Sequence, residues 1–253
     1  PLRIRDEIQA TTLPGFSEVK ATPAKRLISA CTQCGLCVET CPKDIDIGGL
    51  ILEARKSMHR QDKLAWVFNE FWLRDMDFTN GPMAGLVKGS PGSNELCKFA
   101  FFPGCQLGAG EPDLVIKSYQ YLLDREKSTG LILGCCGIPA EWAGNDDKLN
   151  EEISRINTAW QTLGKPTFVL ACPTCANHLK KYLPDIPCVF LYEIMDKEGI
   201  SFSGNSLPVK EYTGTYSVFD PCSTRGNRAL RESVRAIAQK AGYATVMPKR
   251  QNA

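Results

Sequence analysis

Short apolar runs alternate with amphipathic segments through the second half of the chain. The runs are Lys98 to Phe102, Leu131 to Leu133, Thr167 to Ala171 and Tyr216 to Phe219. Apolar positions at helical spacing separate them, in segments from Leu114 to Leu123, from Leu149 to Leu163 and from Leu230 to Ala241. Strands that alternate with helices in this way predict an α/β fold with a doubly wound, largely parallel sheet.

The first third of the chain has a different pattern. Apolar residues recur at helical spacing from Ile47 to Met58, which predicts one helix with a single apolar face. Residues 79–95 then hold four glycines and two prolines, a density of helix and strand breakers that predicts a linker. We therefore expect a small α-helical domain in residues 1–78, separate from the α/β part.

A partial repeat divides the α/β part. The segments Phe102-Pro103-Gly104-Cys105 and Asp220-Pro221-Cys222 each end a predicted strand and precede a predicted helix. We expect a first α/β unit in residues 96–198 and the start of a second unit in residues 199–253, whose remaining cysteines are not in the sequence.

Composition narrows the function classes. The 253 residues carry 30 basic and 28 acidic side chains, and 43% of them are hydrophobic, as in an ordinary folded protein. This near-neutral balance gives no field that would gather phosphates, so we expect no nucleic-acid partner. No apolar run approaches the roughly 18 residues of a membrane span, and no signal peptide is evident. We expect a cytoplasmic protein, either free or bound peripherally at the inner membrane.

Cysteine is unusually frequent, with 12 residues, eight of which lie in three short clusters. Without a secretion signal, such clusters favour metal ligation over disulfides. The first is Cys31-x2-Cys34-x2-Cys37-x3-Cys41-Pro42, the spacing with which bacterial ferredoxins hold a cubane [4Fe–4S] cluster. We thus expect a ferredoxin-like domain. In two-cluster ferredoxins the fourth cysteine serves the other cluster, so either all four hold one cluster or a further ligand lies outside this sequence.

Further cysteines follow successive predicted strands, and the carboxyl ends of parallel strands converge on one crevice. We therefore expect five thiols to share a pocket: Cys105, Cys135, Cys136, Cys172 and Cys175. Four thiolates would also satisfy a tetrahedral zinc ion, which is the alternative at this site. His178 is expected on a helix surface, and His59, Cys97 and Cys188 in packing or surface roles.

The segments Phe102-Pro103-Gly104-Cys105, Gly134-Cys135-Cys136-Gly137 and Cys172-Pro173-Thr174-Cys175 carry a family resemblance. Together they resemble the cysteine-rich CCG domain of heterodisulfide reductase catalytic subunits and of glycolate and lactate oxidase iron–sulfur subunits. The resemblance spans roughly residues 28–250, with a first gap slightly shorter than usual. It implies that the five matching cysteines hold a noncubane [4Fe–4S] cluster at which a disulfide is cleaved.

The resemblance also implies a function and partners. We expect an iron–sulfur oxidoreductase subunit that relays electrons from the cubane cluster to the noncubane cluster, where a disulfide or a related acceptor is reduced. The alternative is a non-catalytic subunit of a flavin dehydrogenase that passes electrons to a quinone. No nucleotide-binding glycine motif is present, so the electron donor is expected on another redox subunit, a flavoprotein or a ferredoxin.

Overall fold

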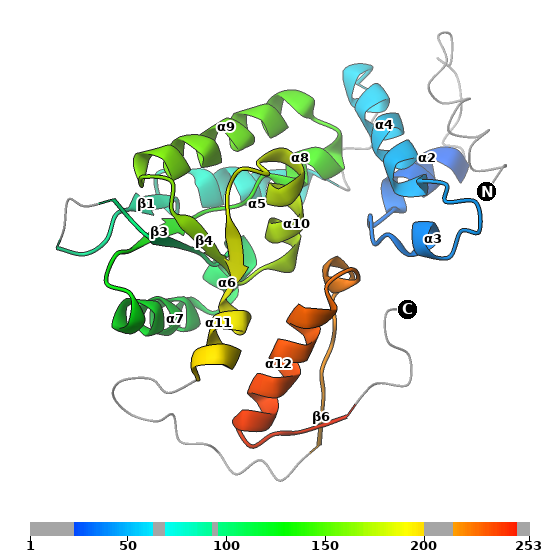
Figure 1. The fold of residues 1–253 in the computed structure, drawn as a ribbon. Helices are drawn as coiled ribbons and strands as arrows, with labels where there is room; N and C mark the ends of the chain where they lie inside the picture. The colour runs from blue at the N-terminus through cyan, green and yellow to red at the C-terminus, as the bar shows by residue number, and fades with distance from the viewer. Residues whose placement is uncertain (1–22, 63–68, 93–95, 200–214, 247–253) are drawn as a thin grey trace. The chain divides into compact units, whose positions relative to one another are not determined.

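The computed structural model describes residues 23–62, 69–92, 96–199 and 215–246 (Figure 1). The chain divides into two compact units. The larger comprises residues 79–136 and 153–253, and the smaller comprises residues 1–78 and 137–152. The smaller unit therefore takes a segment from the middle of the α/β part of the chain.

A five-stranded sheet forms the larger unit. Its strands are β1 (Leu86–Lys88), β2 (Phe99–Phe102), β3 (Thr129–Leu133), β4 (Thr167–Leu170) and β5 (Cys188–Phe190). They lie in the order β1-β3-β2-β4-β5. All neighbouring pairs are parallel except β1 with β3. The predicted α/β class with a largely parallel sheet is confirmed, and one strand, β1, lies within the segment expected to be a linker.

Alternating side chains give this sheet two buried faces. Phe101 and Val169 point to one face, where they pack with α7 (Pro112–Arg125) and α11 (Leu191–Glu198). Phe102 and Phe168 point to the other and meet edge to face, with ring centroids 6.2 Å apart. Figure 1 shows α7 and α11 on one side of the sheet and α9 (Asp146–Thr162) on the other. Cover on both faces explains why these strands are continuous apolar runs.

The strand order places a topological switch point between β2 and β4. The chain leaves β2 toward β3 on one side and returns to β4 on the other side of β2. In open α/β sheets, ligands bind beyond the carboxyl ends of the strands at such a point. Two helices begin there, α6 (Cys105–Gly110) after β2 and α10 (Pro173–Tyr182) after β4.

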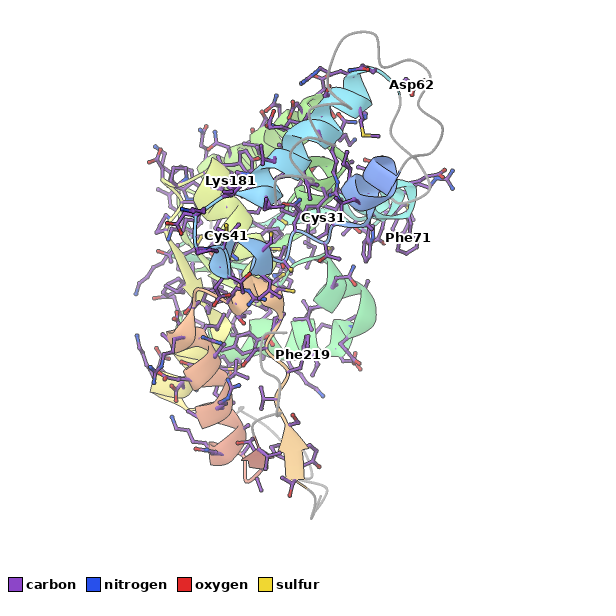
Figure 2. The ribbon with its side chains drawn as sticks, turned by 90° about the vertical axis from the view of Figure 1, so that its right-hand side faces the viewer. Cys31, Cys41, Asp62, Phe71, Lys181 and Phe219 are labelled. Atoms are coloured by element: carbon purple, nitrogen blue, oxygen red, sulfur yellow. The ribbon has the colours of Figure 1, made fainter. Side chains whose placement is uncertain are left out.

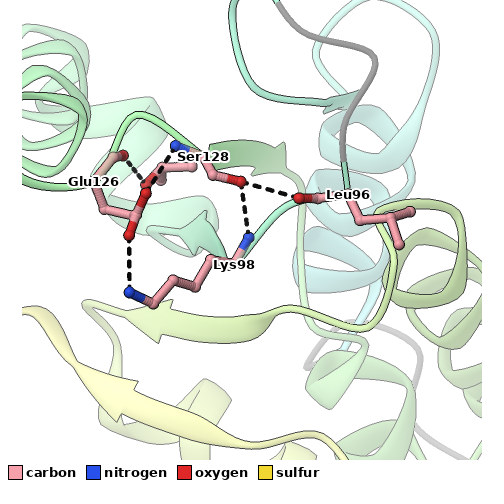
Figure 3. A network of polar contacts seen from close by, with 5 residues as sticks. Leu96, Lys98, Glu126 and Ser128 are labelled. Carbon is pink, nitrogen blue, oxygen red and sulfur yellow. Dashed lines mark hydrogen bonds and ion pairs between the residues drawn. The ribbon is translucent and has the colours of Figure 1, made fainter.

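A polar network joins the opposite, amino ends of β2 and β3 (Figure 3). The Lys98 ammonium lies 2.9 Å from a carboxylate oxygen of Glu126, and the other oxygen accepts the backbone N–H of Ser128. The Ser128 hydroxyl donates to the carbonyl of Leu96 at 3.0 Å. The backbone N–H of Lys98 donates to the carbonyl of Ser128 at 2.9 Å. These contacts fix the register with which β2 and β3 begin to pair.

The predicted strand from Tyr216 to Phe219 does not join the large sheet. Instead β6 (Thr215–Ser217) pairs in parallel with β7 (Ala244–Val246), and α12 (Arg228–Lys240) connects them. The place beside β4 is taken by β5, a three-residue strand that runs directly into α11, so its apolar residues are not separated in the sequence from those of the helix. The prediction of Tyr216 to Phe219 as a further strand of the main sheet was therefore wrong.

Helices form the described part of the smaller unit. They are α2 (Pro23–Ala30), α3 (Leu36–Glu39), α4 (Ile47–Arg60), most of α5 (Glu70–Asn80), α8 (Ile138–Ala143) and the first turns of α9. Its core joins Ile28 of α2 to the apolar face of α4, which consists of Ile47, Ile51, Ala54 and Met58. The predicted helical face is thus confirmed. None of the helices described here is both long and apolar enough to cross a membrane.

Candidate metal centres

Three of the five predicted CCG cysteines meet at the carboxyl ends of the large sheet. Cys136 follows β3, Cys172 follows β4 and Cys175 lies in the first turn of α10. The Cys175 side chain forms hydrogen bonds with the side chains of both Cys136 and Cys172. Cys136 and Cys175 are buried, and Cys172 is partly exposed. Two loops that are distant in the sequence therefore form one sulfur-rich site.

Hydrogen bonds prepare Cys172 as a thiolate. The sulfur of Cys172 forms hydrogen bonds with the Cys175 side chain, the Thr174 hydroxyl and the backbone N–H groups of Thr174 and Cys175. These contacts outweigh burial and lower the pKa of Cys172 to about 6. In contrast, hydrogen bonds to Cys136 and Cys172, together with burial, raise the pKa of Cys175 well above its usual value. A thiolate is the form of cysteine that binds metals.

Gly104 lets a third loop approach this pair. It adopts a φ of 87° and precedes Cys105, the first residue of α6. A Cβ atom at Gly104 would lie 3.1 Å from the Cβ of Cys172 and 3.3 Å from the Sγ of Cys175. The conformation favours glycine, and the close contacts leave little room for a side chain. The loop that carries Cys105 is thereby brought next to Cys172 and Cys175.

Cys135 is buried, and side chains from two helices form hydrogen bonds with its backbone N–H and carbonyl groups. Its backbone N–H donates to Oδ1 of Asn80 at 2.6 Å. Its carbonyl oxygen accepts a hydrogen bond from Nη2 of Arg155, also at 2.6 Å. Neither partner was expected from the sequence, because Asn80 lies in the segment read as a linker and Arg155 on a helix with no cysteine.

The donor set of this site consists of cysteine thiols, which are the protein ligands of iron–sulfur clusters and also of structural zinc sites. Among the residues that the structure describes, no three His, Cys, Asp or Glu side chains are gathered closely enough to hold a single metal ion. This holds for the ferredoxin-motif cysteines as well, so the spacing of the side chains does not distinguish iron from zinc.

The four ferredoxin-motif cysteines lie on a short segment between α2 and α4, and Figure 2 labels the first and last of them, Cys31 and Cys41. The backbone and side-chain N–H groups of Gln33 both donate to Sγ of Cys31 at 3.5 Å. Gly35 adopts a φ of 78° before α3, and no protein atom lies within 4 Å of a Cβ built there. Glycine is needed at position 35 for its backbone conformation.

Arg55 of α4 anchors the start of this segment. Its guanidinium donates to the carbonyl oxygens of Ile28 and Cys31 at 2.8 and 2.6 Å, and to that of Trp142 in α8 at 2.9 Å. Burial lowers the pKa of Arg55, and the charge of Cys31 opposes this effect. A cation at the carboxyl ends of α2 and α8 complements their dipoles.

The cysteines outside the two expected ligand sets differ in burial. Cys97 is buried beside the sheet, Cys188 is exposed in β5, and Cys222 is exposed in the short turn after β6. His178 was expected on a helix surface, but it is only 3% exposed and packs against the Tyr182 ring. That expectation was wrong, because α10 turns the side of His178 and Leu179 inward.

Comparison with known proteins gives matches to two families. Residues 99–180 match the cysteine-rich CCG domain, and residues 2–46 match a 4Fe–4S dicluster domain. The resemblance to the CCG domain and the ferredoxin-type assignment made from the cysteine spacing are confirmed. No solved structure matches the chain.

Two curated relatives are methanogen proteins. The chain is 28% identical over 220 residues to a subunit of the fumarate reductase (CoM/CoB) of Methanothermobacter marburgensis, covering 82% of this chain and 43% of the relative. It is 24% identical over 220 residues to an uncharacterised iron–sulfur protein of Methanococcus maripaludis, covering 83% of this chain and 44% of the relative. The chain therefore spans less than half the length of these relatives. Together with the two domains, these matches identify an iron–sulfur redox protein.

Proposed function

We propose that the chain is an iron–sulfur subunit of a reductase of the heterodisulfide-reductase type. The observation that carries the proposal is the meeting of Cys136, Cys172 and Cys175 at the switch point of the sheet, next to the loop of Cys105. A relative that is named as a subunit of a fumarate reductase (CoM/CoB) supports a role as one subunit among several.

The proposed ligands form two sets. Cys31, Cys34, Cys37 and Cys41 would hold a cubane [4Fe–4S] cluster, and Cys105, Cys135, Cys136, Cys172 and Cys175 a noncubane one. When bound, these groups supply one-electron transfer and, at the CCG site, the reduction of a disulfide or a related acceptor. The donor of the electrons is proposed to be a flavoprotein or a ferredoxin.

The protein's own residues prepare and shield both sites. The N–H groups at the start of α10 stabilise the Cys172 thiolate, and Gly104 leaves room beside it. Burial of Cys135, Cys136 and Cys175 keeps water from the inner side of the CCG site. At the other site, the two N–H groups of Gln33 face the Cys31 sulfur. Hydrogen bonds to sulfur and exclusion of solvent are the means by which proteins set cluster potentials.

Metal and sulfide analysis of the anaerobically purified protein tests the cofactor assignment. We expect about eight iron atoms and no zinc per chain, and an EPR spectrum of the oxidised protein distinct from that of a cubane alone. About four iron atoms with one zinc ion would replace the noncubane assignment with a zinc site. Cys172→Ser and Cys175→Ser are expected to lose about half of the iron. The matched control Cys188→Ser, outside both sets, is expected to keep all of it.

A reactivity assay separates catalysis from electron relay. The chemically reduced protein is mixed with small disulfides, and thiol release is followed. Cleavage that Cys172→Ser abolishes supports a disulfide reductase site. Oxidation by a quinone without any disulfide cleavage supports the alternative, an electron-transfer subunit of a flavin dehydrogenase.

A further inference from the structure

The backbone of Cys135 is held by side chains that are distant in sequence. Its N–H bonds to Asn80, 55 residues earlier, and its carbonyl oxygen bonds to Arg155, 20 residues later. Asn80 is the last residue of α5, Arg155 lies in α9, and all three residues belong to the larger unit. The N–H belongs to the peptide unit before Cys135 and the carbonyl to the peptide unit after it, so neither of the two units that flank this residue can turn without breaking a hydrogen bond. These two side chains therefore fix the direction in which the chain continues to Cys136.

Gly134 makes this arrangement possible. A Cβ atom at this position would lie 2.7 Å from Oδ1 of Asn80 and 3.4 Å from Nη1 of Arg155. The nearer atom is the one that accepts the Cys135 N–H, so any larger residue would push the Asn80 side chain away from the peptide. Gly134 is itself buried, and Asn80 is partly exposed, so the displaced amide would move toward solvent and away from the Cys135 N–H.

We propose that Asn80 and Arg155 are positioning residues that orient the Cys135–Cys136 pair toward the centre bound at the CCG site. The inference rests on the proposed function, because it takes both cysteines as ligands. Neighbours that orient ligand side chains change metal affinity by about 10- to 100-fold. The charge of Arg155 beside a ligand peptide also favours the more negative, reduced state of the centre and so raises its reduction potential.

The test compares variants of the full chain purified without oxygen. Asn80→Ala and Arg155→Met remove the contacts, while Asn80→Asp keeps an acceptor and Arg155→Lys keeps a charge. Gly134→Ala displaces Asn80 without altering it, and also strains the backbone, whose φ is 154° at this position. Two control variants lose similar bonds elsewhere in the larger unit. Asn227→Ala removes a side-chain amide that accepts the Leu230 N–H at 3.0 Å. Arg125→Met removes a guanidinium that donates to the backbone carbonyls of Tyr121 and Gly199.

Three quantities are measured: the EPR spectrum, the midpoint potential of each centre and the rate of iron loss to a chelator. We expect Asn80→Ala and Gly134→Ala to change the spectrum of the CCG-site centre in the same way and to speed its iron loss by about 10- to 100-fold. Arg155→Met is expected to lower the potential of that centre, and Arg155→Lys to restore most of it. The ferredoxin-type centre of the same sample is the internal reference and is expected to stay unchanged.

The proposal would be overturned if Asn80→Ala and Arg155→Met both matched the wild type in EPR spectrum, midpoint potentials and rate of iron loss. Equal changes in the two controls would also overturn it. If Asn80→Ala does not fold, Asn80→Asp and the Arg155 pair decide. If the wild-type protein holds no second iron–sulfur centre, the proposed function fails first. Hydrogen exchange of the Cys135 amide then tests positioning separately, and exchange no faster in Asn80→Ala than in the wild type refutes it.

Discussion

Replacing Arg55 with leucine tests what supports the ferredoxin-type segment. The side chain is buried and makes its contacts with four backbone carbonyls, those of Ile28, Ser29, Cys31 and Trp142. Leucine keeps an apolar stem but leaves these oxygens without their donor. Each hydrogen bond from a charged group contributes about 1.5–3 kcal/mol, but the variant also avoids burying a charge. We expect a net loss of about 3–5 kcal/mol in the stability of the smaller unit.

The matched control is Arg60→Leu. Arg60 lies on the same helix, is largely exposed and reaches Asp146 at 3.7 Å. An exposed ion pair of this kind contributes about 0–1 kcal/mol. The two substitutions thus remove the same charge from α4 in two different surroundings, so a difference between them reports the buried contacts.

Hydrogen exchange of the metal-free protein, read by mass spectrometry on peptides from α2 and α4, is the suitable assay. Because the chain has two units, one unfolding curve would not isolate the smaller one. The expected loss corresponds to opening that is about 10²- to 10⁴-fold more frequent in Arg55→Leu. Exchange within a few-fold of Arg60→Leu would refute the reasoning and show that the carbonyls find other partners.

Three further changes have defined outcomes. Gly144→Ala should destabilise the smaller unit strongly, since its Cβ would lie 2.5 Å from the Lys56 backbone nitrogen at a φ of 69°; hydrogen exchange on peptides from α4 and α8 measures this, and exchange equal to the wild type would contradict it. Gln33→Leu should lower the potential of the ferredoxin-type centre, because it removes the side-chain hydrogen bond to the Cys31 sulfur; redox titration against the Gln61→Leu control would show an unchanged value if this contact is unimportant. Although the Cys188 residue is exposed, desolvation of its sulfur, which lies 3.4 Å from the Ile186 carbonyl oxygen, raises the pKa of Cys188 to about 11, so its alkylation at pH 8 should be slow and should accelerate up to about pH 11; a rate that levels off near pH 9 in peptide mass spectrometry would contradict this.

The sequence predicts those helices and strands in which several apolar side chains are buried at regular spacing. Residues 98–102 and 167–171 read as strands because both faces of β2 and β4 are covered, and residues 47–58 read as a helix because one side of α4 forms a core. The meeting of cysteine loops follows from the same reasoning, since parallel strands carry their carboxyl ends to one edge. Fold class and the general position of the CCG site are therefore accessible from pattern and topology.

Other features depend on partners that pattern does not reveal. Strand β5 has only three residues and is followed at once by α11, so its apolar residues merge with those of the helix, and only the pairing with β4 marks it as a strand. Asn80, Arg55 and Arg155 are polar residues whose roles come from backbone groups 20 or more positions away. Such contacts are chosen by tertiary packing rather than by local preference, which is why residue spacing alone did not predict them.

The smaller unit is discontinuous along the chain. Its two segments, residues 1–78 and 137–152, are separated by the first half of the α/β sheet, and the second segment starts directly after Cys136. A proteolytic cut or a gene truncation in residues 79–95 would thus release a fragment without α8, the helix whose carbonyl at Trp142 binds Arg55. Neither unit could therefore be exchanged between proteins as one continuous segment that ends at this boundary. The polypeptide passes from one unit to the other three times, after residues 78, 136 and 152, and a circular permutant would have to keep these connections.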